Sequence, residues 1–494
     1  MTGRDVNASS GNAPHEVSRR AARAALDAAM NRTLLEIDVT GVLDRPGFNK
    51  GAPGAIVEQS VFGYPADSAR RPDLSVDGVP TELKTTGLVR KSLRGGAVVL
   101  DAKEPVSITA VQPETIVHEE FEESAFLEKC EHLLFVYYEY LHKCTCTADY
   151  GDFPLKAYDF HDLSPTESEI LRRDWERVRD FIRDSQAAGL TPDEAYPLLS
   201  SSLNRHELSA IDTSPKWPAR PRFRLKRAFV SSWVRALFGD RLEIVPEPVD
   251  GLAELDARCR ELRRKYGGKK ICELMTAFGL DSAPMTKAIT ERLCVRMFGG
   301  KSGKIGKIEC IERLSVSLHT VVLTASGGRT EDFKVNQGID FDEVCDPHAS
   351  FEESGFLASF ADAQLLIMLF RETTPGSLAD SEFLGFKRLV IPDEMIEGAV
   401  RSCWERMRQL VFTGGLRDVV EVDANGVPRT NRKTGTVRSA PNWPKASEGD
   451  VFLRGSGRDA RDKTTVVNGI AMYRQNPWIR GVRMVEEIER ADLL

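Results

Sequence analysis

The chain has 494 residues, of which 41% are hydrophobic and 29% charged, and its formal net charge is −7. These values are typical of a globular chain of two or three domains, and no apolar run approaches the roughly 20 residues of a membrane span. The nine cysteines are too thinly spread for a disulfide scaffold. We therefore expect a protein of the reducing cytoplasm, with no membrane partner.

Helix and strand patterns alternate along the first half of the chain. Residues 1–15 are polar and predict a disordered tail, and alanine-rich spacing predicts a helix from His15 to about Met30. Strands are predicted over Thr81–Thr86 and over Glu131–Tyr140, where the apolar run indicates a buried central strand. A capping box begins a helix that we expect over Ser164–Ser185. The mixture predicts an α/β or α+β class around a mostly buried sheet.

The chain also contains an internal duplication. The segment FEESAFL at 121–127 recurs as FEESGFL at 351–357, and WERVR at 175–179 recurs as WERMR at 404–408. The two offsets, 230 and 229, are nearly equal, as expected of tandem copies. A Pro/Gly-containing stretch at 246–251 predicts the boundary, so we expect one domain at 16–245 and a second at 246–494.

The stretch from Asp73 to Lys84 suits phosphodiester hydrolysis. Residues two apart on a strand face the same side, so Glu82 and Lys84 point into one site, and a hairpin at Asp77-Gly78 brings Asp73 alongside. Two carboxylates suit Mg²⁺, which polarises a phosphate and stabilises the leaving oxygen, while the lysine orients water. The pattern is short, and a surface hairpin with a salt-bridged Glu and Lys is the alternative.

A basic segment lies near the end of the first copy. Between Thr213 and Gly239 the chain has no acidic residue and seven basic ones: Lys216, Arg220, Arg222, Arg224, Lys226, Arg227 and Arg235. Such a local stripe on a mildly acidic chain is compatible with a DNA-binding face, and a solvated helix face is the alternative. We expect Lys216, Arg222, Arg224, Lys226 and Arg227 to contact DNA.

Several spaced blocks together closely resemble the MutH family, which comprises a GATC-specific mismatch-repair nicking enzyme and the related Sau-type restriction endonucleases. The blocks are KGAPGAIVE at 50–58, Phe62-Gly63, Pro72-Asp73 and ELKTT at 82–86, continuing through Tyr138, Asp174–Glu176 and Phe223–Phe229. The resemblance spans most of residues 15–240. It implies a restriction-endonuclease core with the PD-(D/E)XK motif, and hence two tandem α/β domains, each a mixed central sheet flanked by helices.

The resemblance also implies roles for individual residues. Asp73 and Glu82 match the family's metal-binding carboxylates, so the implied cofactor is Mg²⁺. Glu58 matches an upstream acidic residue that completes the metal site, Lys84 matches the catalytic lysine, and Lys129 matches a further functional lysine. Lys50 matches the lysine that opens its block, and we expect it to contact DNA. The match departs at Arg224, where the mismatch-repair member has a tyrosine that contacts DNA.

The second copy lacks this chemistry. Ser317 and His319 stand where the first copy has Glu82 and Lys84, and Ser359 stands for Lys129, whereas Glu291 is retained opposite Glu58. An active copy followed by an inactive one resembles the Sau-type enzymes, in which the second copy binds another site and switches on the first. We therefore expect an allosteric DNA-binding domain at 246–494.

The expected function is that of a type II restriction endonuclease that cuts both strands of unmodified GATC in double-stranded DNA. We expect a monomer that pairs on DNA and holds two sites at once. One alternative is a repair-type nickase directed by a partner protein, which the tandem copy disfavours. The other is a DNA-binding regulator without cleavage, which the intact Asp73, Glu82 and Lys84 disfavour.

Overall fold

The computed structural model describes residues 15–65, 71–92, 98–240, 242–286, 288–325, 332–335, 338–352, 354–423, 425–431, 435–457 and 460–494. Contacts between residues divide the chain into two units, Met1–Leu242 and Glu243–Leu494. The tail expected over 1–15 lies outside the described residues except for His15. Among the described residues, no helix is long and apolar enough to cross a membrane.

The first unit begins with a strand where a helix was expected. β1 (His15–Val17) pairs in parallel with β2 (Leu74–Val76), and α1 (Arg19–Ala29) starts only after it. The Ser18 side chain accepts a hydrogen bond from the Ala21 amide at 3.1 Å and so caps α1. The prediction that the helix begins at His15 was therefore wrong, because pairing with β2 holds these residues extended.

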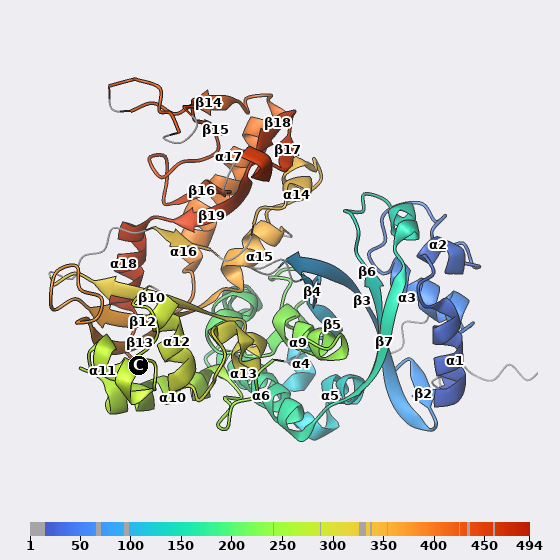
Figure 1. Ribbon diagram of the computed structural model, residues 1–494. Helices are drawn as coiled ribbons and strands as arrows, with labels where there is room; N and C mark the ends of the chain where they lie inside the picture. The colour runs from blue at the N-terminus through green and yellow to red at the C-terminus, as the bar shows by residue number, and fades with distance from the viewer. Residues whose placement is uncertain are drawn as a thin grey trace, which may run out of the picture. The chain divides into compact units, whose positions relative to one another are not determined.

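The central sheet of the first unit is mixed and has the order β1-β2-β3-β6-β7, with β4 paired to β3 (Figure 1). β3 runs parallel to β6, whereas β2 and β4 are antiparallel to β3 and β7 is antiparallel to β6. The strands predicted over Thr81–Thr86 and Glu131–Tyr140 are confirmed within β3 and β6. The bounds are β3 (Val79–Ser92), β4 (Val98–Ala102), β6 (His132–Glu139) and β7 (Leu155–Asp162).

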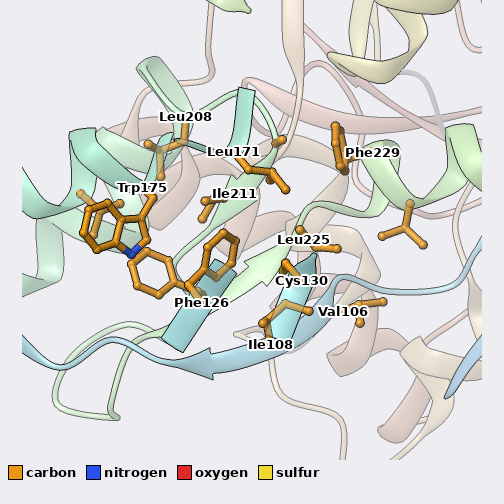
Figure 2. Packing of buried hydrophobic residues seen from close by; sticks show 14 of the residues in the cluster. Val106, Ile108, Phe126, Cys130, Leu171, Trp175, Leu208, Ile211, Leu225 and Phe229 are labelled. Carbon is orange, nitrogen blue, oxygen red and sulfur yellow. The ribbon is translucent and has the colours of Figure 1, made fainter. Parts of the chain in front are cut away.

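Both faces of this sheet are buried, so β6 is apolar from Leu133 to Tyr138. Alternate residues of β6, such as Leu133 and Phe135, join one core, and Leu134 and Val136 join the other. The first core lies under α5, α6 and α9 and under a small sheet of order β5-β9-β8. Figure 2 shows its packing around Trp175 and Phe126. The bounds are α5 (Ala125–Cys130), α6 (Pro165–Ala187), α9 (Arg227–Leu237), β5 (Val106–Ala110), β8 (Ile211–Asp212) and β9 (Arg222–Leu225).

The helix predicted over Ser164–Ser185 is confirmed as α6. Its capping box is present, since the Ser164 hydroxyl accepts from the Glu167 amide and the Glu167 carboxylate accepts from the Ser164 amide. The opposite face of the sheet carries α1 and two short helices, and further short helices connect the remaining elements. Their bounds are α2 (Leu34–Ile37), α3 (Ala52–Ile56), α4 (Pro113–Ile116), α7 (Pro192–Ala195) and α8 (Asn204–His206).

The second unit has a three-stranded sheet of order β10-β12-β13, a second sheet of order β11-β19-β16, and two hairpins, β14-β15 and β17-β18. Its strands are β10 (Val316–Leu323), β11 (Phe333–Lys334), β12 (Gln364–Arg371), β13 (Glu382–Leu389), β14 (Asp418–Val420), β15 (Ser439–Pro441), β16 (Val451–Ser456), β17 (Thr465–Val467), β18 (Ile470–Met472) and β19 (Arg474–Ile479). Its helices are α10 (Leu252–Tyr266), α11 (Ile271–Ala277), α12 (Ala288–Met297), α13 (Glu309–Arg313), α14 (Phe341–Cys345), α15 (Gly355–Ala361), α16 (Asp393–Met395), α17 (Arg401–Phe412) and α18 (Gly481–Arg490).

The sequence repeat is also a repeat of structure. In each unit a parallel pair, β3-β6 or β10-β12, is followed by an antiparallel strand, β7 or β13. A β-bulge interrupts the last pairing at Tyr137/Tyr138 in one unit and at Leu369/Phe370 in the other. A bulge in the same place in both copies is a shared structural feature, because bulges re-aim the strand and persist within families. Both units therefore have the mixed α/β, restriction-endonuclease-like fold predicted from the sequence.

Candidate active site

The hairpin between β2 and β3 positions the first carboxylate. Asp77 and Gly78 both have positive φ, 52° and 85°, which is the conformation of a two-residue turn matched to the strand twist. Leu74 is paired with Thr81, and the Asp73 carboxylate accepts a hydrogen bond of 3.0 Å from the Leu83 amide. The structure thus brings Asp73 beside Glu82.

Glu82 is the centre of a buried charged cluster. Its side chain is 1% exposed and lies 2.6 Å from the Lys84 ammonium, on the same face of β3. Lys129, 7% exposed, reaches it from α5 and donates to both carboxylate oxygens at 3.0 Å. The Ser124 side chain caps α5 by accepting from the Leu127 amide, which fixes the helix that carries Lys129. Residues far apart in the sequence therefore form one site.

The surroundings of Asp73 favour the protonated form of its carboxyl group. Burial raises the pKa of the Asp73 carboxyl, and the negative charge of Glu82 raises it further, while Lys84 and Lys129 oppose the shift. Two carboxylates side by side, one of them with a raised pKa, are a typical binding place for a divalent cation, whose positive charge favours the ionised form of the carboxyl group. The donor set fits Mg²⁺, which takes hard oxygen ligands and keeps several waters.

Glu58 and Lys50 lie on the element that packs beside β3. Glu58 belongs to the π-helical turn Val57–Val61 that continues α3, and α3 contacts β3 near Thr85. Lys50 is exposed just before α3. Among the described residues, no three His, Cys, Asp or Glu side chains are arranged to hold a metal ion. Glu58 therefore does not form a ready three-carboxylate set with Asp73 and Glu82, and its metal role stays a prediction.

The basic segment is split between surface and interior. Lys216 and Arg222 are exposed, and Arg224 on β9 is half-buried. The Lys226 ammonium instead donates to the backbone carbonyls of Asn204 and Leu208, and the Arg227 side chain donates to the Ala102 carbonyl at 2.8 Å. These last two side chains are bonded to backbone carbonyls of other segments, so we expect a structural task for them in the free protein, and the salt dependence of binding tests their predicted contact with DNA.

Arg235 does not belong to a surface stripe. It is 5% exposed and forms a two-point ion pair with Asp101 on β4, at 2.7 and 3.1 Å. The run of basic residues in the sequence therefore overstated the surface charge, because one of them faces the core and has its own buried carboxylate.

The second unit has strands that correspond to β3 and β6, but other residues stand at the positions of Glu82, Lys84 and Lys129. Ser317 is paired with Leu365 in the register that Glu82 has with Leu133 in the first unit. The His319 ring packs on the Phe333 ring with centroids 3.9 Å apart. The hydroxyl of Ser359, the counterpart of Lys129, donates to the Phe356 carbonyl at 2.7 Å. Glu291 lies half-buried on α12.

One further residue was missed from the sequence. Asp212 precedes the acid-free segment directly, and its carboxylate accepts a hydrogen bond of 2.5 Å from the Arg224 guanidinium. Only the antiparallel pairing of β8 with β9 brings the two side chains together. The one available signal was that the acid-free segment begins immediately after an aspartate.

The strand order, together with the cluster of Asp73 just before β2 and Glu82 and Lys84 on β3, defines a restriction-endonuclease-like protein. Residues 62–174 match the model of the family described as the DNA mismatch repair enzyme MutH, which confirms the family resemblance for that part of the first unit. The chain is also similar to the type II restriction enzyme Sau3AI of Staphylococcus aureus, with 24% identity over 364 residues, 70% of this chain and 71% of that protein. Because this stretch is longer than the first unit, the similarity extends into the second.

Proposed function

We propose that the chain is a Mg²⁺-dependent type II restriction endonuclease that hydrolyses phosphodiester bonds in both strands of double-stranded DNA at unmodified GATC. The observation that carries the proposal is the cluster of Asp73, Glu82, Lys84 and Lys129, in which two carboxylates and two ammonium groups converge at β3. The similarity to a type II restriction enzyme over both units supports the same function.

Each side chain of the cluster has a distinct task. Asp73 and Glu82 would hold the ion, which when bound supplies charge neutralisation at the phosphate and the leaving oxygen. Lys129 fixes the Glu82 carboxylate in one orientation, since it binds both oxygens. Lys84 is 20% exposed, so its ammonium can leave Glu82, orient the attacking water and stabilise charge on the phosphate.

The second unit supports a regulatory task. It keeps the three strands that correspond to β3, β6 and β7 of the first unit but has Ser317 and His319 at the proposed catalytic positions. Arg429 and Arg438, the two ends of a basic segment, are exposed; Arg438 pairs with Glu421 at 3.0 Å, and Arg429 is the better placed of the two for phosphate contacts. A second DNA site bound there would activate the first unit if it favoured the cutting-competent state.

A plasmid digest tests the proposal and separates it from the two alternatives. Incubation of a plasmid carrying GATC with Mg²⁺ should give linear products whose ends map to GATC, and EDTA should abolish them. Nicked circles alone would indicate a repair-type nickase, which the MutH match of residues 62–174 favours as the second candidate. Intact supercoiled DNA that is nevertheless bound would indicate a regulator without cleavage.

A further inference from the structure

The small sheet β5-β9-β8 presents a polar face built around one arginine. Phe223 and Leu225 of β9 are buried in the core, so the alternate residues Arg222 and Arg224 lie on the other face. Arg222 is exposed and makes no ion pair with the described residues. Arg224 is different, since its side chain is only 25% exposed and is bound by a carboxylate.

That carboxylate, Asp212, is held on both oxygens. One oxygen accepts from the Arg224 guanidinium at 2.5 Å and the other accepts from the Ser214 amide at 2.6 Å. Asp212 is 4% exposed, so water competes weakly for it. Its side chain therefore links the loop that begins at Thr213 to the guanidinium on the neighbouring strand.

The strand that carries Asp212 is itself fixed from two sides. The buried Asp174 carboxylate on α6 accepts from the amides of Ser209, Ala210 and Ile211 at 2.9, 2.6 and 2.8 Å. The Lys226 ammonium donates to the carbonyl of Leu208 in the same segment. Charge-assisted bonds of this kind are the stronger class, and together they leave Asp212 little freedom to move.

A tethered guanidinium is suited to reading bases more than to binding phosphates. Its plane is fixed before a ligand arrives, so little rotamer entropy is lost on binding. The adjacent carboxylate partly offsets its charge, which weakens its attraction for phosphate. The Arg224 Nε atom is buried without a hydrogen-bond partner in the protein, so the donors left for a ligand are at the terminal nitrogens.

We propose that Asp212 is a positioning residue that sets the sequence selectivity of the first unit by orienting Arg224 toward a base edge with two acceptors, such as guanine O6 and N7. The inference rests on the proposed function, because it takes DNA as the ligand. Such an arginine fork discriminates bases in the major groove, whereas an exposed arginine without such a tether, such as Arg222, adds affinity without selectivity.

Binding selection from a random duplex library, with the full-length chain in Ca²⁺ and in EDTA, tests the inference. Asp212→Asn should lower discrimination at one base pair by roughly tenfold to a hundredfold, with the slope of affinity against salt unchanged. Arg224→Lys keeps the charge but loses the fork, so it should lose the same discrimination. Arg222→Ala, as the matched control, should lower affinity and the salt slope and keep the discrimination.

A double-mutant cycle decides whether Asp212 acts through Arg224. In an Arg224→Ala background, Asp212→Asn should cause no further loss of discrimination, because the two residues act as one unit. Unchanged selectivity in Asp212→Asn, or a full additional loss in the Arg224→Ala background, would overturn the inference. If Asp212→Asn unfolds at a much lower temperature than the wild type, Asp212→Glu, which keeps the negative charge, replaces it in the same selection experiment. If the wild-type chain selects a DNA sequence but cuts no DNA, only the proposed cleavage is refuted. If the wild-type chain shows no preference among DNA sequences, the inference itself is refuted.

Discussion

The Lys129 ammonium lies 3.0 Å from both carboxylate oxygens of Glu82, and the two residues are 47 positions apart in the chain. Both side chains are almost fully buried. The contact joins α5 to β3 and fixes the orientation of a carboxylate that we assign to metal binding. Under the proposed function, stability and catalysis therefore depend on the same pair.

Replacing Lys129 should affect both properties. In Lys129→Ala the buried Glu82 keeps only Lys84, so we expect the metal-free protein to lose about 1–3 kcal/mol of unfolding free energy and cleavage to fall about a hundredfold. Denaturant unfolding and single-turnover digestion measure the two effects. Lys156→Ala is the matched control, because Lys156 pairs with Glu139 on the same sheet at 3.1 Å but outside the cluster. Near-normal cleavage by Lys129→Ala would contradict the assignment.

The proposed metal ligands and lysine can be tested one by one. Asp73→Ala, Glu82→Ala and Lys84→Ala should each abolish cleavage and leave DNA binding largely intact, since none of them lies in the basic segment. Mg²⁺ should raise the Tm of the wild type and of Lys84→Ala, but not that of the two carboxylate variants. A cutting rate near that of the wild type in any of the three variants would show that the site is assigned wrongly.

The basic segment should divide into two functional groups. Lys216→Ala and Arg222→Ala remove exposed charges, so each should reduce the slope of log affinity against log salt by about 0.9. Lys226→Ala should instead lower Tm and leave the slope unchanged, because its ammonium is bonded to backbone carbonyls. Binding titrations over a range of salt concentrations distinguish the groups, and a reduced slope in Lys226→Ala would place that ammonium on the DNA.

His161 predicts a pH dependence of stability. Burial lowers the pKa of this imidazole, but ion pairs with Asp159 and Glu167, at 3.7 and 3.6 Å, outweigh it and raise the pKa to about 9. Because the folded pKa exceeds the unfolded value of about 6.5, the stabilisation is complete below pH 6.5 and is lost as pH rises through 9. His161→Gln should remove on the order of 2 kcal/mol at pH 6 and almost nothing at pH 10. Equal losses at both pH values would show that the histidine is neutral in the folded state.

The second unit should make cleavage depend on the number of sites. A plasmid with two GATC sites should be cut faster than one with a single site, and a short GATC duplex added in trans should accelerate the single-site reaction. Arg429→Ala, in the exposed segment of the second unit, should weaken both effects and spare basal cutting. If wild-type rates do not vary with site number or added duplex, the second unit has another task.

Local sequence patterns were enough to predict several of the strands and helices and the hairpin beside the candidate site. The alternation and apolar runs predicted β3, β6 and α6, and Asp77-Gly78 predicted the hairpin that brings Asp73 to Glu82. These features depend on neighbours within a few residues, which is why a single chain reveals them. The repeated FEES and WER segments likewise predicted two copies of one fold, since related sequences bury the same faces.

Contacts between segments far apart in the chain could not be predicted from local sequence patterns. His15–Val17 forms a strand because β2 is available as a partner, against the helical pattern that follows it. Arg235 and Lys226 look like members of a surface stripe, yet Asp101 and two backbone carbonyls bind them. Asp212 meets Arg224 only across β8 and β9. Burial and partner choice are set by elements many residues away. Strand periodicity and the family resemblance therefore predicted the chemistry of the site, and the tertiary packing decided which charges face solvent and which are held inside.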